Sequence, residues 1–166
     1  MIKFELEPVT DSGHIKKFES QKLSTEQFSF AFGKATAVEI KNRANWICEV
    51  SGRRYEDGWK MDASHRYTHD KNDPKYNDPD NGICLSLPEH LKQHIDIYKD
   101  SLLNGYTQDY KDWARASVQL IARRSYRDGL RTLDHYAAVP LDIIDDRDLV
   151  IEILTDNDLD PAEFIL

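Results

Sequence analysis

The segment from residue 88 to residue 103 limits the possible folds of this chain most strongly. Pro88 suits the first turn of a helix, where its missing N–H leaves no hydrogen bond unmade, and Gly105 follows as a stop signal. Residues four positions apart lie on one face of a helix, so His90 and His94 should project from the same side. Two imidazoles in this arrangement can chelate a metal ion.

The segments before this helix predict a small antiparallel hairpin followed by a loop. Residues 46–52 look like a strand that enters a turn, and residues 59–64 look like a second strand after the turn residue Gly58. Residues 66–80 are polar and contain two Asp-Pro pairs, which favours a loop over a helix. A short apolar run at residues 83–87 then leads into the predicted helix.

The remaining segments predict further helices and a strand-like region at the start. Residues 1–7 alternate between apolar and polar side chains, and phenylalanines alternate at positions 28, 30 and 32, as in strands. The predicted helices cover residues 34–45, 107–128 and 146–154, with a last short turn at Asp160-Pro161.

Length and composition are those of one compact globular unit. The chain has 166 residues, of which 40% are hydrophobic. We expect an α+β fold with an N-terminal segment (1–45), a core (46–104) and a helical extension (105–166). The sequence contains no apolar run long enough to span a bilayer, no signal-peptide pattern and no disulfide framework, so we expect a cytoplasmic protein without a membrane partner.

The net charge of −8 is segregated along the chain. Residues 139–166 contain nine acidic residues and one basic residue, and therefore carry the whole imbalance. Residues 111–131 contain six basic residues and two acidic ones. The overall acidity is thus no objection to binding nucleic acid, which depends on positive charge near phosphates. The candidate contacts to nucleic acid are Arg66, Lys71, Arg115, Arg123, Arg124 and Arg127.

Each charged segment also has a simpler interpretation. The arginines of residues 111–131 can form a solvated helix face. The acidic C-terminus can serve as a solubilising surface, dock on the basic helix of the same chain, or bind a basic partner protein.

A histidine upstream of the predicted helix suggests proton chemistry. His65 follows the second predicted strand, and a neutral imidazole can remove a proton from water. Asn81 lies between it and the helical pair. Imidazole ligands suit zinc, nickel and other transition metals, whereas magnesium and manganese prefer oxygen. A metal opposite the base can stabilise charge developing on a phosphate.

These residues, in this order and spacing, resemble the HNH (ββα-metal) endonuclease family over residues 46–96. The resemblance implies a ββα-metal core and a bacterial or phage setting. It is carried by Cys48-Glu49-Val50-Ser51-Gly52, Asp62-Ala63-Ser64-His65, Asn81-Gly82-Ile83-Cys84-Leu85, His90 and His94.

The resemblance implies an enzyme that hydrolyses phosphodiester bonds of DNA, by nicking or by double-strand cleavage. It makes His65 the general base and Asn81 the residue that fastens the loop and orients that histidine. His90 and His94 become ligands of one divalent ion, which would be Mg²⁺, Mn²⁺, Ni²⁺ or Zn²⁺. DNA is then the expected partner.

The chain departs from the family pattern in two places. Many members carry Asp or His directly before the general base, where this chain has Ser64, so Asp62 becomes a candidate third ligand. Many members also carry two CxxC pairs that hold a structural zinc. Here Cys48 and Cys84 are the remaining halves of such pairs, so we expect a zinc-free core braced by apolar packing.

The same histidines also allow an interpretation in which the protein is not a catalyst. His90 and His94 can be surface residues of a helix, His65 a hydrogen-bonded structural residue, and His69 an ordinary loop residue. The chain would then be a non-catalytic module on an HNH scaffold that binds nucleic acid or a protein.

Overall fold

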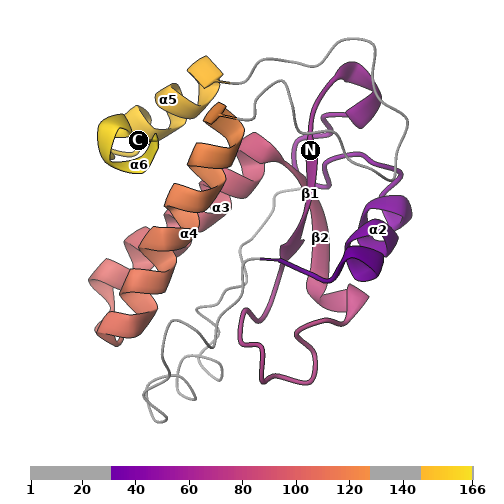
Figure 1. Cartoon of the computed structure of the whole chain (residues 1–166), viewed down its shortest axis with the longest axis horizontal. Helices are drawn as coiled ribbons and strands as arrows, with labels where there is room; N and C mark the ends of the chain where they lie inside the picture. The colour runs from indigo at the N-terminus through magenta and orange to yellow at the C-terminus, as the bar shows by residue number, and fades with distance from the viewer. Residues whose placement is uncertain (1–30, 128–146, 166) are drawn as a thin grey trace.

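The computed structural model describes residues 31–127 and 147–165 (Figure 1). It is an α+β structure with a small sheet of two antiparallel strands. The strand-like regions expected at residues 1–7 and at Phe28 and Phe30 lie outside the described residues. The elements are α2 (Lys34–Arg43), η2 (Tyr55–Asp57), β1 (Met61–His65), η3 (Pro79–Asn81), β2 (Gly82–Ser86), α3 (Leu87–Leu103), α4 (Gln108–Arg127), α5 (Arg147–Asp156) and α6 (Pro161–Ile165).

The sheet pairs β1 with β2, and α3 follows directly after β2. The register places Met61 opposite Ser86 and His65 opposite Gly82. His65 therefore ends β1 at the edge where the long loop leaves the sheet. Because α3 begins immediately after the strand, its first turns lie beside β1, and the candidate residues of both elements meet.

The predicted hairpin between residues 46–52 and residues 59–64 is wrong. Residues 46–52 contribute one isolated bridge, between Ile47 and Arg54, and the N–H of Gly52 turns back to donate to the carbonyl of Cys48. All five residues of β2 are buried, so this apolar run removes more surface from water by pairing than residues 46–52 would.

The expected helices are present, with ends that differ slightly. α3 covers the helix predicted at residues 88–103 and begins one residue earlier, with Pro88 in its first turn. α4 confirms the helix expected at residues 107–128, and α5 the helix expected at residues 146–154. α6 begins at Pro161, as the Asp-Pro signal predicted.

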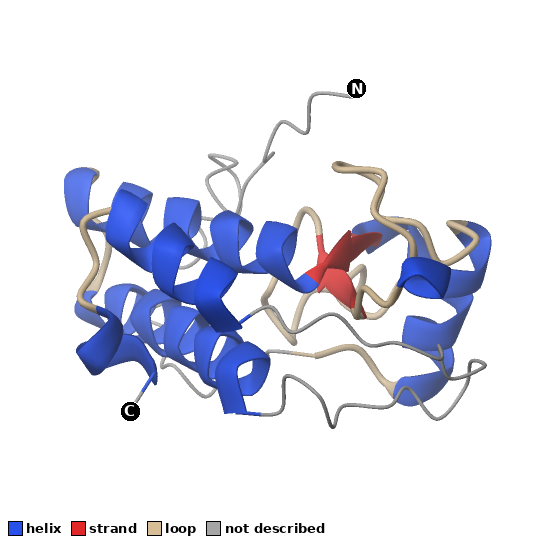
Figure 2. Ribbon diagram, turned by 90° about the horizontal axis from the view of Figure 1, so that it is seen from above, coloured by secondary structure: helices blue, strands red, loops and turns tan. Residues whose placement is uncertain are grey.

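The sheet lies between α2 on one side and the pair α3 and α4 on the other (Figure 2). Ile40 of α2 is fully buried against the strands. Gly82 makes this close approach possible, because a Cβ at this position would collide with Cδ1 of Ile40. This contact between α2 and Gly82 thereby fixes the start of β2.

A second core lies among α3, α4, α5 and α6. Its buried members include Leu91 and Ile95 of α3, Val118 of α4, Leu154 of α5 and Phe164 of α6. The helix α3, which carries the candidate metal ligands, thus packs into this second core. Within residues 31–127 and 147–165, no helix combines the length and the apolar character needed to cross a bilayer.

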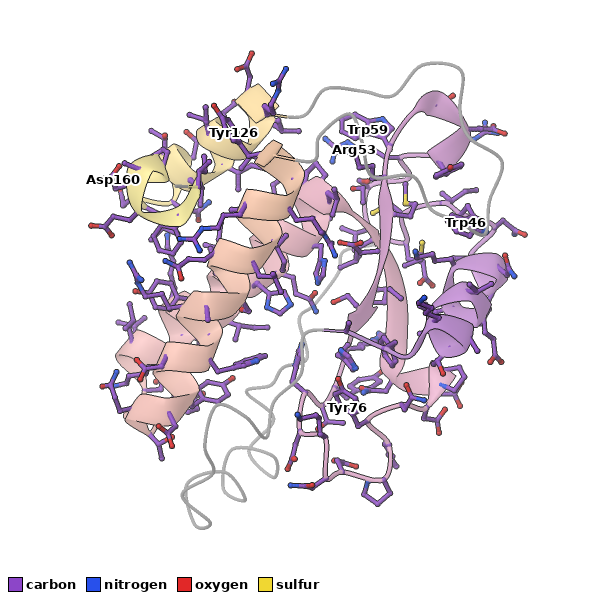
Figure 3. All side chains as sticks on the ribbon, in the orientation of Figure 1. Trp46, Arg53, Trp59, Tyr76, Tyr126 and Asp160 are labelled. Atoms are coloured by element: carbon purple, nitrogen blue, oxygen red, sulfur yellow. The ribbon has the colours of Figure 1, made fainter. Side chains whose placement is uncertain are left out.

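The turn before η2 is braced against α3 by a charged side chain (Figure 3). The guanidinium of Arg53 lies 4.6 Å from the ring centre of Trp59, and its Nη1 is 3.0 Å from Oε1 of Glu89. Cys48 and Cys84 are free thiols, and both are buried in the apolar cluster around the strands. Their side chains thus act as small core residues, as expected.

Candidate active site

The structure brings four histidines into one buried row. The ring centres of His65 and His69 are 5.3 Å apart, those of His69 and His94 are 5.4 Å apart, and those of His94 and His90 are 4.9 Å apart. All four side chains are buried, with 1–5% of each residue exposed. The sequence identified three members of this row. His69 belongs to it because the loop after β1 folds back toward α3 and α4.

The two histidines of α3 are each held at Nδ1. Nδ1 of His90 lies 2.8 Å from Oδ2 of Asp62, and Nδ1 of His94 lies 2.8 Å from Oγ of Ser117. Ser117 also donates its hydroxyl hydrogen to the carbonyl of Ala114 at 2.7 Å. Because that hydrogen is used, the Ser117 oxygen accepts the hydrogen on Nδ1 of His94.

The carboxylate of Asp62 fixes the other imidazole in the same way. Burial by itself would raise the pKa of Asp62, but the charge of Arg124 and the hydrogen bond from His90 hold this pKa well below its usual range. The ionised carboxylate only accepts, so Nδ1 of His90 is the donor. Both α3 histidines therefore keep the Nε2 lone pair for a further partner, as metal-binding histidines do.

His65 is held by ring contacts. The ring of Phe32 stacks on it at a centroid distance of 3.7 Å, and the ring of Tyr76 stacks at 4.4 Å. The hydroxyl of Tyr76, which is labelled in Figure 3, donates to the carbonyl of Ala31 at 2.8 Å, so the loop and residues 31–32 enclose the imidazole. Within the described part of the chain, no side chain or carbonyl hydrogen-bonds to Nε2 of His65.

This enclosure keeps His65 neutral. Burial, with a smaller contribution from the nearby His90, lowers the pKa of His65 to about 3. Burial likewise lowers the pKa of His94 well below its ordinary value. Neutral imidazoles keep a lone pair that can bind a metal, whereas the lowered pKa makes His65 a weak proton acceptor as long as it is enclosed.

Asn81 ties the long loop to the end of β1. Its Oδ1 accepts from the backbone N–H groups of Tyr67 at 2.8 Å and Thr68 at 3.0 Å. Its Nδ2 donates to the carbonyls of Thr68 at 3.0 Å and Tyr76 at 3.1 Å. The amide thus fixes the backbone shortly after His65. It also fixes the backbone of Tyr76, whose ring stacks on His65.

Ser64 faces α3 and is already engaged. Its hydroxyl donates to Oε1 of Gln93, and Nε2 of Gln93 donates to the carbonyl of His65 at 3.1 Å. This clamp joins the end of β1 to the turn of α3 between the two candidate ligands. Position 64 therefore supplies alignment of strand and helix in this structure.

The described candidate nucleic-acid contacts lie on the loop after β1 and along α4. Arg66 lies at the loop start with its guanidinium 5.0 Å from the ring centre of Tyr67, and Lys71 is exposed further along the loop. Arg124 reaches into the site and pairs with Asp62. Arg123 is half-buried on α4, and the side chain of Arg127 lies outside the described residues.

Arg115 instead meets the acidic C-terminus. Its Nη2 lies 3.3 Å from Oε2 of Glu163, and its guanidinium lies 5.0 Å from the ring centre of Phe164. Gln119 also donates to the carbonyl of Glu163 at 3.1 Å. Of the three roles considered for the acidic segment, docking within the chain is thus observed for α6 on α4.

Several of these contacts have no signal in the sequence. Ser117, Gln93 and Phe32 are ordinary residue types, and the elements that carry them are placed by packing.

Among the described residues, no group of three or more His, Cys, Asp or Glu side chains is arranged to hold a metal ion. His90 and His94, whose hydrogen bonds use Nδ1, remain the candidate pair of donors. Comparisons with protein-family models, curated proteins and solved structures found no match for this chain.

Proposed function

We propose that this protein is a metal-dependent endonuclease of the HNH type, which hydrolyses phosphodiester bonds of DNA. The observation that carries the proposal is the state of the three histidines. His90 and His94 each have Nδ1 hydrogen-bonded and Nε2 uncommitted, and neutral His65 lies in the same buried row. Two antiparallel strands followed by a helix, in the order of the HNH resemblance, support a ββα-metal core.

In this proposal the two groups of histidines divide the chemistry. His90 and His94 hold one divalent ion, and a transition metal such as Ni²⁺ or Zn²⁺ suits two imidazoles better than Mg²⁺ or Mn²⁺ does. A bound ion would supply a positive charge that stabilises the phosphate in the transition state. His65 accepts a proton from the attacking water, and Asn81 holds the loop that follows it.

The enclosure of His65 by Phe32 and Tyr76 favours a second candidate function. A base that is 2% exposed has no direct path to a DNA backbone in this conformation. The alternative is a non-catalytic module on the same scaffold that binds nucleic acid or a protein. Under the leading proposal, the segment at Phe32 must move for DNA to reach the imidazole.

The test is plasmid cleavage by the purified chain with Mg²⁺, Mn²⁺, Ni²⁺ or Zn²⁺, and with EDTA as the control. We expect cleavage with at least one metal, none with EDTA, and none by His65→Ala under any condition. The variant should keep the wild-type circular dichroism and metal affinity. Failure of the wild type with every metal would support the binding module, and full cleavage by His65→Ala would remove that residue from the mechanism.

A further inference from the structure

The ion pair between Arg124 and Asp62 links α4 to the candidate metal ligands. Asp62 lies on β1, Arg124 near the end of α4, and His90 in the first turns of α3. Oδ2 of Asp62 receives both the guanidinium of Arg124 and Nδ1 of His90. Three elements that are distant in sequence therefore converge on one carboxylate oxygen.

The side chains that meet at this carboxylate oxygen are partly shielded from water, which holds the contact in one geometry. The side chain of Asp62 is 17% exposed, that of His90 6% and that of Arg124 37%. Partial exclusion of water strengthens hydrogen bonds between charged groups and makes an unpaired carboxylate costly. A carboxylate that already faces a guanidinium on the same oxygen has little freedom to turn away from the imidazole.

We propose that Asp62 and Arg124 are positioning residues for His90, and that Arg124 acts through Asp62. The carboxylate accepts the hydrogen on Nδ1 of His90, so the lone pair stays on Nε2, and the guanidinium holds the carboxylate in place. This proposal rests on the proposed function in that it takes His90 as a metal ligand. It assigns Asp62 to orienting a ligand and Arg124 to the site, away from direct contact with DNA.

Outer partners of metal-binding histidines contribute roughly 10–100-fold to metal affinity. We therefore expect Asp62→Asn to weaken binding of Zn²⁺ or Ni²⁺ by about that factor, measured by titration calorimetry with the metal alone. Arg124→Gln should weaken it by a smaller factor. Lys111→Gln is the matched control, because it removes one positive charge from the same helix about 20 Å away along its axis.

A double-variant cycle separates positioning from general destabilisation. If Arg124 acts through Asp62, Arg124→Gln weakens metal binding in the wild-type background and adds nothing in the Asp62→Asn background. The double variant also leaves no lone buried charge, so it should fold even where a single variant does not. Equal weakening by Arg124→Gln in both backgrounds would overturn the proposal.

A readout on the imidazole completes the test. In the metal-free protein, ¹⁵N chemical shifts should show His90 with its hydrogen on Nδ1, and Asp62→Asn should shift the ring toward a mixture of tautomers. Unchanged shifts in that variant would refute the positioning role. Absence of metal binding by the wild type would instead refute the proposed ligand pair, so the two failures are distinguishable.

Discussion

His65 and the pair His90 and His94 occupy one buried row, but the protein holds them in different ways. The α3 histidines are fixed through hydrogen bonds that Nδ1 donates to Asp62 and to Ser117. His65 is fixed by the stacked rings of Phe32 and Tyr76, and within the described residues its Nε2 has no hydrogen-bond partner.

The difference separates two kinds of chemistry. A hydrogen bond donated by Nδ1 fixes the tautomer and the direction of the Nε2 lone pair. This arrangement suits a metal ligand. Ring stacking fixes the plane of an imidazole and leaves Nε2 of His65 without a partner, so this nitrogen can accept a proton once the enclosure opens. Under the proposed function, this contrast favours His65 as the general base and not as a third metal ligand beside His90 and His94.

Replacing a ligand should give the largest effect. We expect His90→Ala or His94→Ala to weaken Zn²⁺ or Ni²⁺ binding by at least about 100-fold, because loss of a ligand should exceed the loss of an outer partner. His65→Ala is the control and should change the calorimetric affinity little. Comparable weakening by His65→Ala would break the contrast and make His65 a ligand.

The stability of the protein should depend on pH through its buried neutral histidines. The pKa of His65 in the folded protein is about 3, below its unfolded value of 6.5, and that of His94 is also lowered. The unfolded chain therefore binds more protons below pH 6.5, and the free energy of unfolding falls as the pH drops from 6.5 toward 3.

For His65 the loss is at most about 1.4 kcal/mol per pH unit, or about 2 kcal/mol at pH 5. Urea unfolding of the wild type and of His65→Gln between pH 7 and pH 5 measures this slope. The variant should show the shallower dependence. Identical slopes would mean that His65 is hydrated and titrates normally.

Removing the hydrogen bond to His94 should have a smaller effect. We expect Ser117→Ala to weaken metal binding about 10-fold and to lower the free energy of unfolding by about 1 kcal/mol. Ser125→Ala is a matched control, because Ser125 is also buried on α4 but its hydroxyl has no partner among the described residues. A metal affinity that responds equally to both variants would argue against a specific role for Ser117.

The stack on His65 should contribute modestly to stability. Phe32→Leu keeps an apolar side chain but removes the stacked ring, so we expect a loss of about 1 kcal/mol in the free energy of unfolding. The imidazole should also react faster with diethyl pyrocarbonate, as read by mass spectrometry of the His65 peptide. An unchanged rate of modification would show that Phe32 does not shield His65.

The sequence predicted the helices better than the strands. Pro88 and the apolar spacing of residues 88–103 specify α3 locally. Local apolar spacing likewise specifies α4 and α5. Strand pairing depends on which segments compete for one partner. Residues 46–52 have strand-like composition, but β1 pairs with the fully buried β2, a choice that local sequence cannot reveal.

The sequence by itself determined that His90 and His94 share a helix face, because the helical repeat fixes that geometry. It also placed Asn81 at the end of a polar loop. Only the tertiary structure decided which nitrogen of each imidazole is used, because Asp62, Ser117 and Phe32 come from three other segments. Packing of β1 and α4 against α3, and stacking of Phe32, which precedes α2, on His65 at the end of β1, bring these side chains together.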